Sequence, residues 1–525
     1  MKSQIVEIAV PPELIESGEA IREKALKVAK IPGNKSASVE TLRRSVDARG
    51  RKPVYRLRLR ISEEGETGSN STRYMDGFKN VESAREVLIV GAGPAGYFAA
   101  LECLEQGIKP IVLDRGKDVR RRRRDLRDIQ QFGKVNPDSN YCFGEGGAGT
   151  YSDGKLYTRS KKRGDYKKIL HLLVEHGAPD DIAIDAHPHI GSNKLPKIVS
   201  AIRETIEARG GQVYFDHRVT DLLIEKDRVE GVVTNGDTVF KADAIVLATG
   251  HSARDIYRLL HNKKISIEAK GFALGFRVEH PQKLIDSIQY NTAERGEFLP
   301  ASSYSLACQV GSKGVFSFCM CPGGLVVPAA TAPGEIVVNG MSLSKRNSPF
   351  ANSGMVVSVE PGDIRKGKSA DPFACLDFQA EVEQNVFKWG DGSQAAPAQR
   401  LTDFMEGRVS GDLPESSYIP GLLSRPVHEI LPDEITASLR KAIGQFEKKM
   451  RGYLTRDAVA IATESRTSSP IRIPREKTSL MHPQVKGLFP CGEGAGYAGG
   501  IMSAAMDGQR VIKAVATFYQ KNQAK

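Results

Sequence analysis

Three glycines, at positions 91, 93 and 96, have the spacing that most clearly predicts chemistry in this chain. They follow a short apolar run, residues 87–90, of the kind that forms a buried parallel strand. Gly91 lets the chain turn sharply off the strand, and Gly93 leaves room for a pyrophosphate to approach the backbone. Gly96 lets the next helix pack close to the sheet. The pattern therefore predicts a dinucleotide-binding site.

The elements around these glycines must position the phosphates. A helix is predicted over 94–106, and it begins with Pro94 and Ala95. Its N-terminus directs unpaired N–H groups and a partial positive charge at an anion. A second apolar strand is predicted over 109–113, which completes a strand–helix–strand unit.

An acidic residue, Asp114, ends this second strand, and Arg115 follows it. A carboxylate at this position suits the hydroxyls of an adenosine ribose. The competing interpretation is a glycine-rich turn in some other α/β protein. Residues 144–149 repeat the glycine spacing, but no apolar strand precedes them, so they do not predict a second nucleotide site.

The segment 141–157 alternates glycines with polar residues and cannot form a regular element. We expect a loop whose backbone N–H groups face the cofactor, with Gly147, Gly149, Ser152 and Lys155 among its contacts. A long surface turn is the alternative.

Candidate substrate contacts lie in two further loops. A buried strand predicted over 242–250 ends at Gly250, and His251 and Arg254 follow at the sheet edge where ligands bind in such folds. His189 lies in a polar loop beside His187. Structural hydrogen bonding is the alternative role for all three candidates, and two histidines at i, i+2 do not predict a metal site.

Near the C-terminus a strand meets a glycine loop that contains Gly492, Glu493 and Gly500. A helix of small residues is predicted from Ile501. The N-terminus of this helix would be a second anion-stabilising end, and in a flavin site it could face the ring carbonyl where negative charge gathers on reduction.

The seven cysteines show no zinc-type spacing. Cys319 and Cys321 form the close pair, and they are either buried apolar thiols or groups with a redox or flavin-adjacent role. An odd number of scattered cysteines suits a reducing compartment. The sequence lacks a long apolar stretch and the features of a signal peptide at its first residues, so we expect a cytoplasmic location without a membrane span.

The formal charge of +12 raises the question of nucleic acid. Residues 120–124 are five consecutive arginines, which either contact phosphates or form a solvated helix face. Because no aromatic residues interleave with them, a base-stacking surface is not supported, and nucleic acid is not the expected partner.

The chain is too long for one compact core. We predict an α/β protein with a Rossmann-like nucleotide-binding domain, an inserted α+β cap or substrate domain, and a small N-terminal α+β domain. The predicted bounds are 1–80 for the small N-terminal domain, 84–264 and 481–525 for the two parts of the nucleotide-binding domain, and 265–480 for the cap.

Taken together, the motifs resemble the bacterial family of uncharacterised FAD-dependent dehydrogenases, within the glutathione-reductase-like FAD/NAD(P)-binding superfamily. The segments that carry the resemblance span nearly the whole chain, at 143–155, 250–255, 277–281, 319–324 and 492–501. The resemblance implies noncovalent FAD under a cap domain. It also implies that Val219 pairs with the adenine by its backbone and that Gly492, Glu493, Ile501 and Met502 lie near the pyrophosphate and flavin.

The expected function is that of an FAD-dependent oxidoreductase that passes hydride between a small-molecule substrate and the flavin. One dinucleotide unit is visible in the sequence, so NAD(P)H would visit transiently or another protein would donate electrons. A flavin-dependent monooxygenase is an alternative on the same fold. A flavin-carrying RNA-binding or RNA-modifying protein is a second alternative, which the basic charge suggests.

Overall fold

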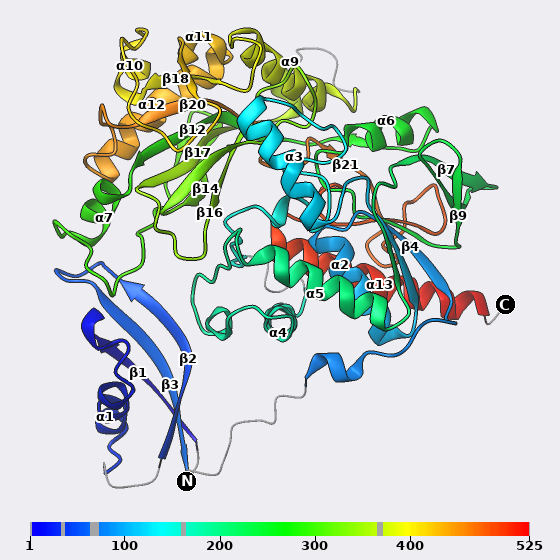
Figure 1. Ribbon diagram of the computed structural model, residues 1–525, viewed down its shortest axis with the longest axis horizontal. Coiled ribbons are helices and arrows are strands. Elements are labelled where there is room, and N and C mark those ends of the chain that lie inside the picture. The colour runs from blue at the N-terminus through cyan, green and yellow to red at the C-terminus, as the bar shows by residue number, and fades with distance from the viewer. Residues whose placement is uncertain (1–2, 33–36, 64–72, 159–163, 365–370, 524–525) are drawn as a thin grey trace.

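The computed structural model describes residues 3–32, 37–63, 73–158, 164–364 and 371–523 (Figure 1). A parallel sheet covered by helices lies beside a larger mixed sheet, and a small sheet with one helix forms the N-terminal part. None of the described helices combines the length and the apolar sequence that a membrane-spanning segment needs.

The N-terminal sheet pairs its strands antiparallel in the order β1–β3–β2. β3 alternates strictly, with Leu57 and Leu59 buried and Arg56 and Arg58 exposed. Its apolar face packs with the buried side of α1, which explains the period of two in the sequence. The bounds are β1 (Gln4–Val10), α1 (Gly18–Ala29), β2 (Ala37–Asp47) and β3 (Val54–Glu63).

The parallel sheet has the order β22–β10–β4–β5–β6 in the described part of the chain. Its strands are short, and all but the half-buried edge strand β6 are mostly buried, as apolar runs covered on both faces must be. Because all pairs are parallel, the carboxyl ends of the strands meet at one edge of the sheet. The bounds are β4 (Glu86–Val90), β5 (Lys109–Leu113), β6 (Gln212–Tyr214), β10 (Ile245–Leu247) and β22 (Leu488–Pro490).

Helices cover one face of this sheet and form its largest apolar core (Figure 1). Gly508 of the last helix brings that helix against the first turn of α2, since a Cβ on Gly508 would lie 2.1 Å from the Ala95 carbonyl oxygen. The C-terminal helix thus returns to the strand–helix unit that begins the fold. The bounds are α2 (Pro94–Gln106), α4 (Tyr166–Glu175), α5 (Leu195–Ala208) and α13 (Ile501–Gln523).

A second core lies on the other face of the parallel sheet, under a three-stranded antiparallel sheet and the helix α6. These elements occupy the segment between the glycine loop and the mixed sheet. Their bounds, with that of the preceding arginine-rich helix, are α3 (Val119–Phe132), β7 (Val219–Glu225), β8 (Arg228–Thr234), β9 (Thr238–Lys241) and α6 (Arg254–Asn262).

The mixed sheet has the order β13–β14–β17–β12–β20–β18–β19. The strands β11 and β21 lie at the two ends of the segment that forms the mixed sheet, and they pair with each other. The chain therefore leaves the parallel-sheet unit and returns to it at the same place. The strands of the mixed sheet are β12 (Phe272–Pro281), β13 (Ala307–Val310), β14 (Lys313–Cys321), β17 (Phe350–Val359), β18 (Ala396–Arg400), β19 (Leu422–Ser424) and β20 (Val459–Glu464). The two separate antiparallel pairs are β11 (Glu268–Ala269) with β21 (Ile471–Arg472) and β15 (Gly324–Pro328) with β16 (Val338–Ser342).

Helices pack on the mixed sheet around an apolar core of its own. The described strands from β11 to β21 all belong to sheets other than the parallel one. The longest of the helices on the mixed sheet is α12, which buries its apolar side against that sheet. The helices of this part are α7 (Gln282–Tyr290), α8 (Pro361–Ile364), α9 (Ala374–Lys388), α10 (Leu401–Glu406), α11 (Val427–Ile430) and α12 (Asp433–Lys449).

Candidate functional site

The glycine turn after β4 contains two kinds of glycine. Gly91 has φ +109, and a Cβ there would lie 2.4 Å from the Ala248 carbonyl oxygen. A Cβ on Gly96 would lie 1.8 Å from the Gly91 carbonyl oxygen. Both glycines are therefore required by the packing of the backbone itself, as the sequence predicts.

Gly93 is different, because neither its conformation nor its packing requires glycine. Its φ of −77° and ψ of −174° are open to any residue, and the nearest atom to a Cβ there is the Gly147 Cα at 3.9 Å. The missing side chain leaves free space in front of the first turn of α2. No side chain caps this helix terminus, so its first N–H groups are available to a ligand.

That space belongs to a cavity with an empty volume of about 1300 Å³ at the carboxyl edge of the parallel sheet. This volume includes the space at the mouth of the cavity that is open to solvent. The expected cofactor contacts that line it are Gly91, Gly93, Pro94, Ala95, Asp114, Arg115, Gly147, Gly149, Ser152, Lys155, Val219, Gly250, Glu493, Gly500 and Ile501.

Three expected cofactor contacts are not among the described residues that line this cavity: Gly96, Gly492 and Met502. Gly96 sets the distance between α2 and the turn. The Gly492 N–H donates to Asp507 at 2.8 Å, and Met502 is buried in the helix-covered core. These three residues lie next to lining residues in the sequence, but they are not in the lining themselves.

The Asp114 carboxylate connects the glycine turn to the next loop. Its two oxygens accept hydrogen bonds from the N–H groups of Ala92 and Gly116, each at 2.8 Å. It lies at the cavity edge, where each oxygen keeps a lone pair for a further donor. Arg115 instead pairs with Asp138 and Asp255, at 2.8 Å each.

The glycine-rich loop of residues 141–157, called the glycine loop from here on, is held in place by Arg122. Neither interpretation of the arginine run anticipates this role. Arg122 is fully buried and donates to the carbonyl oxygens of Asn140, Glu145 and Gly147 at 2.8–2.9 Å. This arginine therefore serves neither as a phosphate contact nor as part of a solvated face. Arg122 lies on the buried side of its helix, and its neighbours in the run lie on the exposed side. Because all five residues of the run are arginine, the sequence gives no contrast that would identify the buried one.

The three candidate substrate contacts have different surroundings. His251 lines the cavity, and burial, aided by the charge of Arg466, lowers its pKa to about 4. His189 is not among the described lining residues, and its Nε2 lies 3.1 Å from the Ser344 carbonyl oxygen. Burial and the charge of Arg346 also lower the pKa of His189 to about 4. Both rings are therefore neutral at pH 7.

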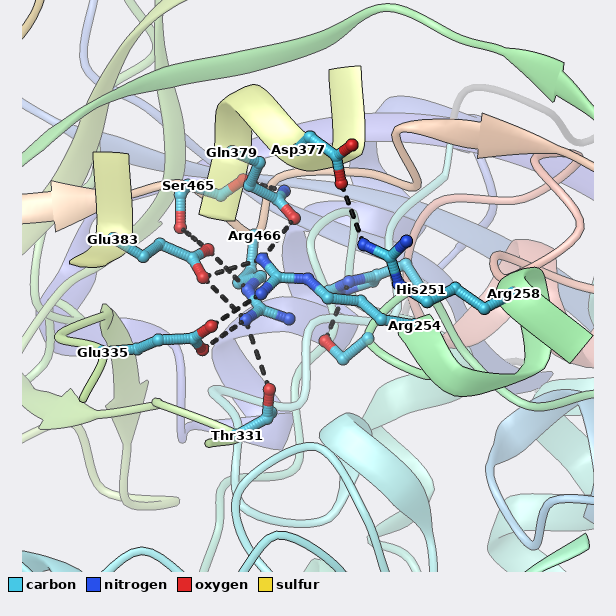
Figure 2. Close-up of polar contacts among 11 residues, drawn as sticks. His251, Arg254, Arg258, Thr331, Glu335, Asp377, Gln379, Glu383, Ser465 and Arg466 are labelled. Atoms are coloured by element: carbon cyan, nitrogen blue, oxygen red, sulfur yellow. Dashed lines mark hydrogen bonds and ion pairs between the residues drawn. The ribbon is translucent and has the colours of Figure 1, made fainter. Parts of the chain in front are cut away.

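Arg254 is directed away from the cavity into a buried ion cluster (Figure 2). It pairs with Glu335 at 2.7 Å and with Glu383 at 2.8 Å, and it donates to Gln379 at 3.0 Å. Arg466 contacts the same two carboxylates. Arg254 thus ties α6 to the mixed-sheet part, and this geometry argues against the substrate contact expected from the sequence.

Cys319, for which the sequence leaves a choice between a buried apolar thiol and a redox or flavin-adjacent role, lines the cavity. It enters the cavity from β14, opposite Lys155 of the glycine loop. The Lys155 Nζ lies 3.7 Å from the Cys319 sulfur and 3.6 Å from the Cys321 sulfur. The mixed-sheet part therefore supplies groups to the same cavity as the parallel sheet.

Glu493 places an ionisable group in the same cavity. Burial raises its pKa to about 7, against the Gly500 N–H and the charge of Lys270, which lower it. A carboxyl group with this pKa can accept or donate a proton at neutral pH. Among the described residues, no cluster of His, Cys, Asp and Glu has the arrangement of a metal site.

Family models match this chain in four places. Residues 84–125 match the FAD binding domain, and 194–302 match the FAD dependent oxidoreductase model. Residues 271–467 match the model described as FAD-dependent protein, C-terminal domain-like, and 1–62 match a domain of unknown function. With the cavity geometry, these matches define an FAD-dependent oxidoreductase, an enzyme whose cofactor is FAD.

A protein of Clostridium beijerinckii described as uncharacterized is 43% identical over 432 residues, which cover 81% of this chain and 80% of that protein. The chain belongs to the same family as this protein. An FAD-dependent monooxygenase of Hypoxylon pulicicidum is 23% identical over 216 residues, covering 37% of this chain and 42% of that protein.

Solved flavoenzymes align with most of the chain at low similarity. CtdE in complex with FAD is 11% identical, with 83% of this chain and 84% of that chain covered and a TM-score of 0.31. The flavin-dependent halogenase CmlS is 9% identical, with 83% and 57% covered and a TM-score of 0.37. These scores are too low to support an argument about the site.

Proposed function

We propose that the protein is a dehydrogenase or reductase that transfers hydride between a small-molecule substrate and FAD held noncovalently in this cavity. The observation that carries the proposal is the open space at Gly93, where neither φ nor packing requires a glycine. A diphosphate on the N–H groups of α2 accounts for that space.

The lining residues suggest how the chain holds the cofactor. The diphosphate would lie on Gly93 and Ala95, the ribose hydroxyls would donate to Asp114, and the Val219 backbone would face the adenine. The flavin would then lie toward Gly149 and Ile501, whose side chain is 3.2 Å from a Cβ built on Gly149. This order places the ring between the glycine loop and α13.

Bound FAD supplies a hydride acceptor and donor. The side chains near the ring would manage the charge and the proton that accompany each transfer. Glu493 would hold or release the proton, since its pKa is raised to about 7. Lys155 would stabilise negative charge, because nearby anionic groups outweigh burial and raise its pKa. His251, neutral at pH 7, would offer a hydrogen bond to the substrate.

Substitution of Gly93 by valine tests where the cofactor lies. The new side chain would fill the space in front of α2, so FAD is expected to separate from the variant on gel filtration while the thermal unfolding midpoint stays near that of the wild type. Gly411→Val is the matched control, because a Cβ there meets nothing within 4 Å and Gly411 lies outside the cavity lining. Full FAD retention in Gly93→Val would contradict the proposal.

Anaerobic reduction tests the reaction. NADH, NADPH and candidate substrates are added to the holoprotein without oxygen, and bleaching of the flavin absorbance is followed. Bleaching by a small molecule supports a dehydrogenase or reductase with a visiting reductant. Bleaching only with a reduced electron-carrier protein would assign the reductant role to a protein partner. A preparation that neither contains nor takes up flavin would end the proposal.

A flavin-dependent monooxygenase is the second candidate, and the match to the Hypoxylon pulicicidum monooxygenase favours it. Oxygen consumption that equals NAD(P)H oxidation and depends on an added organic substrate would support it. Reduction that proceeds at the same rate with and without oxygen, and yields no oxygenated product, would favour the dehydrogenase.

A further inference from the structure

We propose that Cys319 and Cys321 form a redox-active dithiol that exchanges an electron pair with the flavin in the cavity. The proposal rests on the proposed FAD site, because it needs the flavin ring at the end of the cavity that Cys319 lines. The dithiol would be a second two-electron centre beside the flavin, and it consists of two side chains of this protein.

The backbone at this position is irregular. The register of β14 against β17 shifts between Phe318 and Cys321, which inserts an extra residue into the strand. Cys319 has φ +45, a left-handed conformation that a residue with a side chain rarely adopts. Bulges and such conformations re-aim side chains next to functional sites. Here the bulge turns Cys319 to the cavity, and Cys321 stays buried behind it.

The two sulfur atoms are neighbours. The Cys321 thiol donates to the Cys319 carbonyl oxygen at 3.2 Å, and the Lys155 Nζ lies within 3.7 Å of both sulfurs. On an unbroken strand, residues two apart are separated by about 6.6–6.8 Å, near the limit for a disulfide. The bulge therefore gives the pair an approach that a regular strand would not.

Positive charge surrounds the pair. Lys155 lies 3.7 and 3.6 Å from the two sulfurs, and the Arg277 Nη1 is 3.4 Å from the Cys319 carbonyl oxygen. The acidic groups that face this cluster are Asp153, 3.5 Å from Lys155, and Glu464, 2.9 Å from Arg277. Arg346 neutralises Asp153 from its other side at 2.5 Å.

These surroundings shift the pKa values of the two thiols in opposite directions. The hydrogen bond from Cys321, with the charges of Lys155 and Arg277, lowers the pKa of Cys319 although burial and Asp153 oppose the shift. The pKa of Cys321 is raised by the same hydrogen bond and by burial. The lowered pKa favours the thiolate form of Cys319, whose sulfur faces the cavity, and the raised pKa favours the thiol form of Cys321. Burial raises the pKa of the remote cysteines Cys103, Cys308, Cys375 and Cys491.

The chemistry of the exchange balances with the flavin alone. The Cys319 thiolate and the Cys321 sulfur form an S–S bond, and the S–H bond of Cys321 breaks. Two electrons and one proton pass to oxidised flavin as a hydride equivalent, so mass and charge are conserved. The reverse direction restores the thiolate and the thiol.

A mass-spectrometric experiment tests the pair without relying on enzyme turnover. Full-length protein is treated with diamide, the oxidant is removed, free thiols are alkylated, and peptides are mapped. The expected result is a loss of two hydrogen masses in the peptide that contains both cysteines, with neither of them alkylated. Cys321→Ser should abolish this loss and Cys308→Ser should not. Alkylation of both residues after diamide would overturn the proposal.

The role of Lys155 is measured by the rate of iodoacetamide alkylation at Cys319 at pH 6.5. Lys155→Met is expected to lower this rate about tenfold, which corresponds to one pKa unit, and Lys155→Arg is expected to restore most of it. Cys308 in the same sample is the internal reference. An unchanged rate in Lys155→Met, with folding verified by circular dichroism, would contradict the arrangement.

Anaerobic titration with dithionite then links the pair to the flavin. Diamide-oxidised holoprotein should consume four electrons per flavin, and Cys321→Ser should consume two. Equal consumption by both proteins, with FAD retained, would overturn the dithiol proposal and leave the proposed function intact. A protein without FAD would overturn the proposed function, whereas the diamide and alkylation results would still decide the state of the cysteines.

Discussion

Two buried charge clusters border the proposed flavin site, and they are built differently. In the closed cluster, Arg254 and Arg466 face Glu335 and Glu383, so two positive charges meet two negative charges out of reach of the cavity. The open cluster consists of Lys155, Asp153, Arg277, Glu464 and the cysteine pair, and it reaches the cavity through Asp153, Lys155 and Cys319.

The two glutamates show what this difference does. Burial alone would raise the pKa of Glu383, but the charges of Arg466 and Arg254 outweigh it and lower the pKa to about 2. Burial raises the pKa of Glu464 to about 7, because Arg277 opposes the shift alone and the Cys319 charge adds to it. The Oε1 atom of Glu464 has no hydrogen-bond partner among the described residues. The clusters differ in charge balance rather than in hydrogen bonding, since Arg254 Nε and Arg466 Nη1 of the closed cluster also lack hydrogen-bond partners among the described residues. Glu383 therefore stays ionised at neutral pH, whereas Glu464 can exchange a proton there.

The largest expected effect is on the closed cluster. Glu383→Ala would leave Arg254 and Arg466 with Glu335 as their remaining shared carboxylate, so two buried positive charges would face one negative charge. Breaking a buried pair in this way costs about 3–5 kcal/mol of unfolding free energy. Urea unfolding followed by circular dichroism measures the change. A loss below about 1 kcal/mol would mean that the cluster is not a structural tie.

The second prediction concerns the pH dependence of stability in the open cluster. Because the folded-state pKa of Glu464 is raised from 4.5 to about 7, its stabilising contribution is present below pH 4.5 and is lost as the pH rises through 7. The unfolding free energy of the wild type minus that of Glu464→Gln should therefore fall between pH 5 and 8, by about 1–3 kcal/mol. A flat difference, measured by urea unfolding at each pH, would place the pKa of Glu464 near its ordinary value.

A smaller effect is expected at the opening of that cluster. Cys319→Ser removes a half-buried sulfur that lines the cavity, so we expect the unfolding free energy to change by less than about 1 kcal/mol. The variant should nevertheless form no disulfide with Cys321 after diamide treatment and should show no alkylation by iodoacetamide at position 319. A large loss of stability in thermal unfolding would instead assign Cys319 a packing role.

The smallest effect is expected at a surface pair beside the closed cluster. Arg258 and Asp377 are 3.0 Å apart, with 55% and 35% of their side chains exposed (Figure 2). Asp377→Asn should cost about 0.2–1 kcal/mol, since exposed ion pairs contribute little. Measured beside Glu383→Ala, it is the matched control for removal of a carboxylate from an arginine partner.

Several parts of the fold could be predicted because each follows from its own local sequence. The apolar run before Gly91, the helix that begins at Pro94 and the apolar strand over 109–113 all appear where the sequence predicts them. The arginine run shows the limit of this approach. Five identical residues conceal that Arg122 points inward to three carbonyl groups, and nothing in the composition separates it from its exposed neighbours.

The sequence by itself determined the glycine turn, the acid at Asp114 and the glycine loop, because these depend on φ values and side-chain sizes that each residue imposes on its own backbone. The tertiary structure alone decided that Arg254 joins Glu383, 129 positions away, and that Lys155 meets Cys319, 164 positions away. The physical reason is that a charge or a thiol acquires its chemistry from neighbours. Those neighbours come from distant segments that meet only when the sheets pack.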